Sequence, residues 1–136
     1  MNMTSQIASL SRGWIARYEA IQRHGEQSPE ALATFQAFEQ FEGAVAQDPE
    51  LAWQAILNVL EQSENEFVLE NLAAGPLETL IGRHAAGFID RVEQRARVDE
   101  RFRWLLGGVW QGLIPQEFWQ RVERAQGDGA NAQPDA

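Results

Sequence analysis

The sequence contains no cysteine, which excludes several classes of site at once. Disulfide-stapled scaffolds, cysteine-ligated zinc and thiol nucleophiles all need a sulfur that this chain does not supply. No apolar run approaches the ~18 residues that a membrane-spanning helix needs. The first residues, Met1 to Ser5, carry neither a basic nor an apolar segment, unlike a signal peptide. We therefore expect a cytoplasmic protein that folds without cross-links and has no contact with a membrane.

Lysine is also absent, so the eleven Lys and Arg residues are all arginine. This excludes a Schiff-base lysine and a phosphate-loop lysine. Arginine is missing in turn from the interval between Arg23 and Arg83, which carries eleven acids. From Arg83 to Arg124, by contrast, eight arginines outnumber six acids. The net charge of −9 therefore predicts an acidic half that attracts a basic partner and a mildly basic half, although solvated helix faces give the same pattern.

Apolar residues recur at three- and four-residue steps through most of the 136 residues, and no segment alternates with a period of two. A hydrophobic content of 44% is enough for a core at this length. The pattern predicts an all-α fold, a compact bundle or HEAT-like stack of seven to eight short helices. We expect one helical domain over residues 1–126 and a disordered tail over residues 127–136, which are small and polar.

Short polar residues and prolines signal where helices of the first half begin. An N-cap side chain accepts a free backbone N–H, and proline fits the first helical turn. These signals stand at four places: Thr4 or Ser5, Ser28-Pro29, Asp48-Pro49, and a capping box from Ser63 to Glu66. They predict a helix over residues 4–24 that Gly25 ends, and a second that runs unbroken from residue 29 past Val45. The third, from Pro49, is apolar around more than half its circumference and is expected to be the most buried of these.

In the second half, the Gly75-Pro76 pair is predicted to be a junction between two helices. Gly75 suits a helix end and Pro76 the first turn of the next helix. Glu78 would then lie in that first turn, where its carboxylate satisfies free N–H groups. Three further features are expected: a break near residues 84–87, a cap at Asp99 on a helix that runs through Gly107-Gly108 to Trp110, and a last helix opened by Pro115.

Three residues are candidates for catalysis: Glu78, His84 and Asp90, beside a pocket near Gly75-Pro76. A carboxylate and an imidazole are the usual pair for acid–base work. The alternative is that Glu78 and His84 only serve helix ends. Two histidines without an HExxH pattern do not make a metal site, and no ExxH accompanies the acids that a dimetal bundle site would use, namely Glu66, Glu70, Glu78, Asp90 and Glu93. We expect no cofactor and no metal.

The candidate residues for partner binding are acids of the arginine-free interval: Glu30, Glu39, Glu42, Glu61 and Glu64. The arginine run from Arg83 to Arg103 either pairs internally or binds a ligand. We do not expect direct binding of nucleic acid, because the sequence pI is about 4.6 and acids interleave the arginines. Trp14 or Trp119, near the chain ends, is a candidate exposed anchor.

Three blocks of the sequence carry a resemblance. They are LAAGPLE at residues 72–78, FID at residues 88–90, and FRxLLGGVW at residues 102–110. Together with Trp53, they resemble a small bacterial all-helical domain family of unknown function over roughly residues 50–122. The resemblance implies a compact helical domain without an established activity, and it leaves residues 1–49 as a variable, partner-facing addition.

These observations favour a non-enzymatic protein–protein interaction module of the bacterial cytosol. Its acidic surface would bind a basic partner, in the manner of an immunity protein or a phage-type inhibitor. Two alternatives stay open. One is a small enzyme or regulatory subunit with a pocket near Gly75-Pro76, and the other is a structural homo-oligomer.

Overall fold

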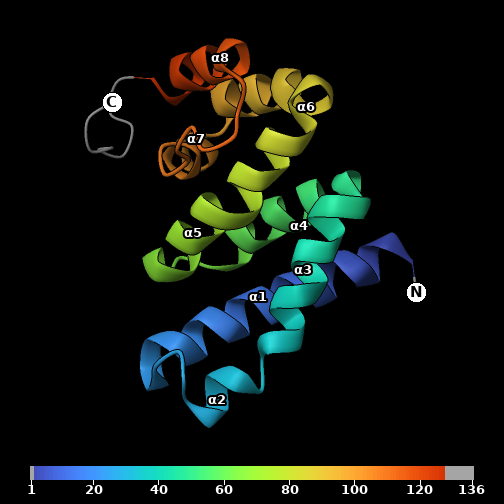
Figure 1. Cartoon of the computed structure of the whole chain (residues 1–136), viewed down its shortest axis with the longest axis vertical. Helices are drawn as coiled ribbons and strands as arrows, with labels where there is room; N and C mark the ends of the chain where they lie inside the picture. Colours follow the sequence, from blue (N-terminus) through green and yellow to red (C-terminus); the bar gives the residue numbers. More distant parts are fainter. Residues whose placement is uncertain (1, 128–136) are drawn as a thin grey trace. The chain divides into compact units, whose positions relative to one another are not determined.

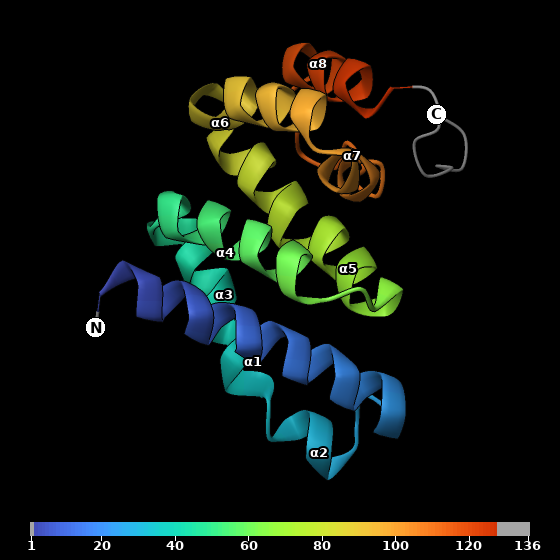
Figure 2. The same ribbon diagram turned by 180° about the vertical axis from the view of Figure 1, so that it is seen from behind.

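The computed structural model describes residues 2–127, and within that range the chain is helical without a strand (Figures 1 and 2). The elements are α1 (Met3–His24), α2 (Pro29–Leu32), α3 (Phe35–Gln47), α4 (Pro49–Gln62), α5 (Glu66–Leu72), the π-helical turn η1 (Ala73–Leu77), α6 (Glu78–Val98), α7 (Glu100–Leu106) and α8 (Gln116–Gln126). The all-α prediction is confirmed, and the number of helices is close to that expected. Apart from Gly127, the predicted tail lies outside the described residues.

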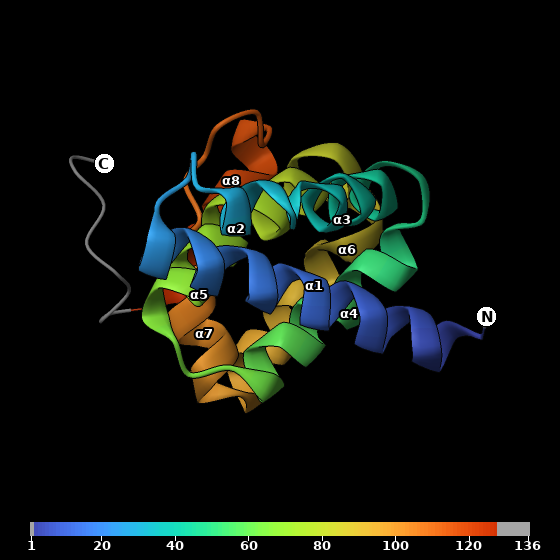
Figure 3. The same ribbon diagram turned by 90° about the horizontal axis from the view of Figure 1, so that it is seen from below.

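The helices form two compact units, Met1–Leu72 (unit 1) and Ala73–Ala136 (unit 2), which are described separately. The single domain predicted over residues 1–126 stays a prediction. In unit 1, α1 packs against α3, α4 and α5, and the short α2 packs against its C-terminal half (Figure 3). Trp14 lies at the centre of this core, 1% exposed, beside the ring of Phe41. Its indole Nε1–H donates to the carbonyl of Val68 over 3.4 Å, so a buried polar group is satisfied.

Most start and stop signals of unit 1 act as predicted. Ser28 Oγ accepts the N–H of Ala31 at 3.1 Å, and Asp48 Oδ1 accepts the N–H of Leu51 at 3.3 Å. Gly25 ends α1 with φ of 92°, a conformation that glycine adopts freely. The most buried helix of unit 1 is α4, as expected, and its buried residues are Leu51, Ala52, Trp53, Ala55, Ile56, Val59 and Leu60.

Two predicted caps are wrong because an asparagine nearby caps the helix instead. Asn2 caps α1 in place of Thr4 or Ser5, and its Oδ1 accepts the N–H of Ser5 at 2.8 Å. Asn65 rather than Ser63 serves α5, since its Oδ1 accepts the N–H of Phe67 at 3.0 Å. Both are N-cap interactions of the usual kind.

The helix predicted to run unbroken from residue 29 past Val45 is wrong: it divides at Ala33–Thr34 into α2 and α3. In a continuous helix, the carbonyl of Ala31 would accept the N–H four residues later. Here Thr34 Oγ1 donates to that carbonyl at 2.6 Å, and Arg17 Nη1 from α1 donates to it at 3.1 Å. The backbone N–H of Thr34 also donates to the same carbonyl, at 3.0 Å. These three donors replace the helical hydrogen bond, and the chain turns.

In unit 2, α7 and α8 pack against α6, and α7 also contacts η1 (Figures 1 and 2). The predicted break is present within α6, where His84 has φ of −128° and ψ of 28°. Asp99 caps α7 as predicted, accepting the N–H of Phe102 at 3.1 Å. The prediction that α7 continues to Trp110 is wrong. It ends at Leu106, because two successive glycines are poor helix formers; Gly107-Gly108 form a turn, and Val109 and Trp110 are irregular.

Candidate functional site

The Gly75-Pro76 segment is not the predicted junction between a helix end and a helix start. Residues Ala73–Leu77 form one π-helical turn that runs directly into α6, and Leu77 is helical with φ of −66° and ψ of −46°. Proline lacks an N–H, and in an α-helix its ring clashes with the carbonyl four residues earlier. The wider π turn leaves room for the proline ring, and single π turns of this kind occur within helices elsewhere. Pro76 and Leu77 are buried, so the segment contributes to the core of unit 2.

Glu78 does not serve the start of its own helix, which corrects the second part of that prediction. Its Oε1 accepts the backbone N–H of Trp110 at 3.0 Å, 32 residues along the chain. Its Oε2 approaches Gly112, where a Cβ would lie 2.9 Å away and φ is +48°. Glu78 therefore braces the loop between α7 and α8, and glycine at residue 112 makes room for the carboxylate. Burial raises the pKa of Glu78, and the hydrogen bond from Trp110 offsets part of that shift.

The braced loop presents two apolar side chains to solvent. Trp110 is 46% exposed and Leu113 is 94% exposed. The predicted anchors are wrong: Trp14 is 1% exposed and Trp119 is 7% exposed. The glycines on both sides of Trp110 were the signal that this tryptophan lies in a loop rather than on a buried helical face.

The other catalytic candidates lie on α6 and have different surroundings. Asp90 Oδ1 accepts a hydrogen bond from Arg121 Nη2 of α8 at 2.7 Å, whereas Glu78 contacts the loop. In a straight α-helix, residues 78 and 90 would be about 18 Å apart along the axis. His84 lies at the break between them. Gly75 and Pro76 line neither the surface hollow formed by α6, α7 and α8 nor the one formed by α1 and α4, so no observation brings these groups to one pocket.

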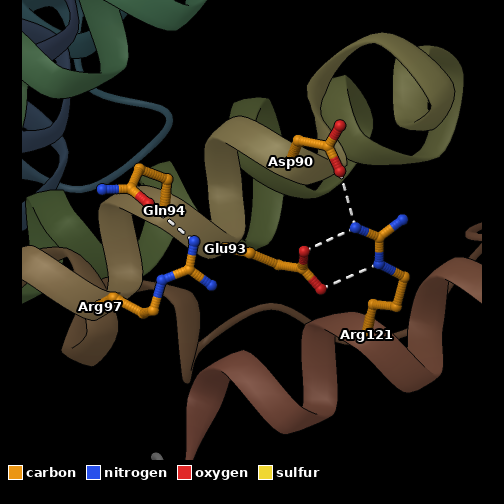
Figure 4. Close-up of polar contacts among 5 residues, drawn as sticks. All are labelled: Asp90, Glu93, Gln94, Arg97 and Arg121. Atoms are coloured by element: carbon orange, nitrogen blue, oxygen red, sulfur yellow. Dashed lines mark hydrogen bonds and ion pairs between the residues drawn. The ribbon is translucent and has the colours of Figure 1, made fainter.

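Arg121 joins α8 to α6 through two carboxylates, as Figure 4 shows. Besides its contact with Asp90, it donates from Nε to Glu93 Oε2 at 2.9 Å and from Nη2 to Glu93 Oε1 at 2.6 Å. This two-pronged pairing is the geometry in which a guanidinium binds a carboxylate most specifically. The hydrogen bonds from Arg121 hold the pKa of Glu93 below its ordinary value.

Part of the arginine run also pairs internally, and the partners lie within unit 2. Arg95 Nε lies 3.1 Å from Asp99 Oδ2, and Arg103 Nη2 lies 3.9 Å from Glu100 Oε1. The first of these is a hydrogen-bonded ion pair, and the second is a looser contact of an exposed carboxylate.

The acids predicted to bind a partner are all exposed on unit 1. Glu30 of α2 lies 3.7 Å from His24 Nδ1. The other four form no hydrogen bond or ion pair with any residue of the described range: Glu39 and Glu42 of α3, Glu61 of α4 and Glu64 of the link to α5. Across residues 2–127, no group of three or more histidines and acids is placed to hold a metal ion.

No helix in the described part of the chain combines the length and the apolar character that crossing a membrane requires. The chain matches no curated protein and no solved structure. A family model described as a family of unknown function (DUF6869) matches residues 22–129. The match begins well before residue 50, so α2, α3 and the start of α4 are part of the family domain rather than an addition to it. The chain therefore belongs to the family of unknown function DUF6869.

Proposed function

We propose that the protein is a non-enzymatic binding module whose acidic unit 1 engages a basic protein partner. One observation carries the proposal: Glu39, Glu42, Glu61 and Glu64 are exposed and have no ion pair within the described residues. They belong to a unit with eleven acids and three arginines, hence a formal net charge of −8. A basic surface would supply the counter-charges that the unit itself lacks.

One of the three arginines of unit 1 is buried and cannot contact a partner's acids. Arg17 is 8% exposed, and its Nη1 is engaged by Ala31 and Thr34. Its guanidinium also lies over the rings of Phe35 and Phe38, 5.3 Å from each centroid. This cation serves the packing of α1 against the α2–α3 corner. Arg12 and Arg23 alone then stand at the surface against the acids.

Association driven by exposed carboxylates has a recognisable signature. Charges at a surface act over about 8 Å at physiological ionic strength. They raise the association rate with an oppositely charged partner, and added salt lowers that rate. The proposal therefore predicts binding that weakens steeply with salt.

The test compares variants that lose the same number of charges from the two units. Glu39→Gln with Glu42→Gln, and Glu61→Gln with Glu64→Gln, remove acids from unit 1. Glu117→Gln with Glu123→Gln removes two exposed acids from unit 2 and is the matched control. Each immobilised variant is used to capture proteins from the native host, at low and at high salt, with quantitative mass spectrometry.

We expect one basic protein that the wild type and the control retain equally at low salt. Each pair of unit 1 substitutions should reduce its retention several-fold, and all four together at least tenfold. Retention of the same partner at unchanged affinity by the fourfold variant would refute the proposal. Immunity proteins and phage-type inhibitors are small, acidic and helical in this way, so a basic toxin or defence protein is the partner class we favour.

A dimer built by unit 1 would be a different use of the same surface. Light scattering across a concentration series separates the two, because a net charge of −9 opposes self-association at low salt. A monomer under those conditions supports a heterologous partner, and a salt-resistant dimer contradicts it.

A further inference from the structure

Three helices of unit 2 surround a surface hollow of about 380 Å³. The volume equals that of roughly a dozen liquid water molecules, enough for a small polar group and part of what carries it. Its lining comes from α6, α7 and α8 and the residue that follows: Glu93, Ala96, Arg97, Arg103, Arg124, Ala125 and Gly127. The hollow therefore gathers three guanidinium groups from three different helices.

These three guanidinium groups keep most of their donors free within the described residues. Each has five N–H donors. Arg97 Nη2 donates to Gln94 Oε1 at 2.7 Å, and Arg103 Nη1 donates to the carbonyl of Ala96 at 2.8 Å. Arg124 has no hydrogen bond or ion pair with another residue of the range 2–127. Arg103 Nη2 also lies 3.9 Å from Oε1 of the exposed Glu100, which is a loose contact. The two hydrogen bonds go to neutral acceptors, so they hold the side chains of Arg97 and Arg103 without neutralising their charge.

Glu93 is the one acid of the lining, and Arg121 already occupies it. Both carboxylate oxygens accept hydrogen bonds from that guanidinium, at 2.9 and 2.6 Å (Figure 4). Arg121 lies outside the lining and takes no part in the hollow itself. The hydrogen bonds of Glu93 therefore go to Arg121, and its attraction to Arg97 is weaker than its attraction to Arg121. Formally, the four charged side chains of the lining sum to +2.

We propose that this hollow binds the dianionic phosphate group of a phosphate monoester or of inorganic phosphate. A phosphate monoester carries about −1.5 to −2 charges at neutral pH, which matches the lining with opposite sign. Its three free oxygens can each receive one guanidinium fork, whereas a carboxylate offers two oxygens to one fork. A nucleic-acid backbone presents single charges spaced along a strand, and a closed cluster of three arginines does not follow such a strand.

The proposal is independent of the acidic surface, because every residue it uses lies in unit 2. The arginine run from Arg83 to Arg103 then has members of two kinds, those that pair internally and those that bind the ligand. Arg95 pairs with Asp99, while Arg97 and Arg103 join Arg124 around the hollow.

The test measures phosphate binding to the full chain by isothermal titration calorimetry at constant ionic strength. The hollow variant combines Arg97→Gln with Arg124→Gln, both exposed side chains whose loss leaves the core intact. Arg103 is spared because it also binds the carbonyl of Ala96. Arg83→Gln is the control: Arg83 is exposed on α6, lies outside the hollow and has no partner in the described range.

Four probes separate the possible anions: inorganic phosphate, O-phosphoserine, glutamate, and a dinucleotide without a terminal phosphate. For inorganic phosphate, and likewise for O-phosphoserine, we expect the wild type and Arg83→Gln to have the same Kd. The hollow variant should bind each of these two probes at least tenfold more weakly. Glutamate and the dinucleotide should bind the wild type at least tenfold more weakly than phosphate does. Stronger binding of O-phosphoserine than of inorganic phosphate would identify an esterified ligand, and the reverse order the free anion.

Two further variants separate loss of the binding site from loss of folding and from loss of charge alone. Arg124→Gln alone removes a side chain without a partner in the described range, so its circular dichroism spectrum should equal that of the wild type, with binding several-fold weaker. Arg97→Lys with Arg124→Lys keeps both charges and loses the planar guanidinium donors, so affinity should fall between that of the wild type and that of the hollow variant. Equal affinity of the hollow variant and Arg83→Gln, equal affinity for glutamate and phosphate, or no phosphate binding at all would overturn the proposal.

Discussion

The two units carry similar numbers of acids and differ in what those acids face. Unit 1 has eleven acids with three arginines, and unit 2 has nine acids with eight arginines. In unit 2, Asp90, Glu93 and Asp99 each accept a hydrogen bond from an arginine of the same unit. In unit 1, four exposed glutamates have no such partner in the described residues. The external field of a unit therefore depends on which acids are paired as well as on how many there are.

The largest effect we expect concerns the buried arginine of unit 1. Arg17→Ala removes a side chain packed against Phe35, Phe38 and Tyr18, and should lower the free energy of unfolding by about 2–4 kcal/mol. Arg17→Met keeps the length and the packing while removing a buried Nε that has no acceptor, so its cost should be about 1 kcal/mol or less. Urea unfolding followed by circular dichroism measures both. Equal losses in the two variants would show that charge, rather than packing, keeps Arg17 in place.

The paired arginine of unit 2 should matter less for stability, although it makes more hydrogen bonds. Arg121→Gln removes the bonds to Asp90 and Glu93, which are solvent-accessible at this surface. Exposed ion pairs contribute little because water and salt screen them, so the loss should be well below that of Arg17→Ala and should shrink as salt is added. A loss as large as that of Arg17→Ala, unchanged by salt, would contradict this.

The contribution of the Arg121–Glu93 pair to stability depends on pH, and the sign of that dependence follows from the pKa of Glu93. Arg121 lowers the pKa of Glu93 in the folded state, so the folded state holds that proton less tightly than the unfolded state. The contribution is present above the ordinary glutamate pKa, and it is lost as pH falls through the lowered one. Arg121→Gln should therefore lose part of the wild type's sensitivity to acid, which unfolding curves at neutral and acidic pH will show.

Local signals in the sequence predicted much of each unit, and contacts between distant residues explain the rest. The caps at Ser28, Asp48 and Asp99 and the stop at Gly25 depend on atoms within three or four residues. The break that divides α2 from α3 depends on Arg17 from another helix, 14 residues before the carbonyl it binds. Glu78 binds a backbone N–H that is 32 residues away. No periodicity or capping rule contains such information, because it arises only when helices pack.

The candidate sites divide in the same way. Exposure of Glu30, Glu39, Glu42 and Glu61 follows from helical periodicity, which places them off the apolar stripes, and Glu64 lies in the link between α4 and α5. The sequence placed two of the three arginines of the hollow, Arg97 and Arg103, in one run, but nothing in it linked Arg124 to them. Arg124 comes from α8, and its approach to Arg97 and Arg103 depends on how α8 packs against α6 and α7. The spacing of Trp110 continues the stripe of α7, although the chain has already left that helix, so periodicity placed this exposed loop residue on a helix.

The smallest effect on stability that we expect is at Glu78. Its pH dependence differs from that of Glu93 in the same unit. Burial raises the pKa of Glu78, so the folded state holds this proton more tightly than the unfolded state does. Its contribution to stability is present below the ordinary glutamate pKa and is lost as pH rises through the raised one. Two carboxylates of one helix, Glu78 and Glu93, therefore affect stability with opposite sign as pH changes.

Glu78→Gln keeps an oxygen that accepts the N–H of Trp110 and removes a partly buried charge. At neutral pH we expect it to be as stable as the wild type within about 0.5 kcal/mol. Glu78→Ala leaves that N–H without its acceptor and should cost more, about 1 kcal/mol. The amide resonance of Trp110 in ¹H–¹⁵N spectra offers a direct measurement: in the wild type it should titrate with a pKa above that of an ordinary glutamate, and in Glu78→Gln it should not titrate in that range. A Trp110 resonance that follows the same titration in both proteins would mean that another group braces the loop, and that the opposition between Glu78 and Glu93 is wrong.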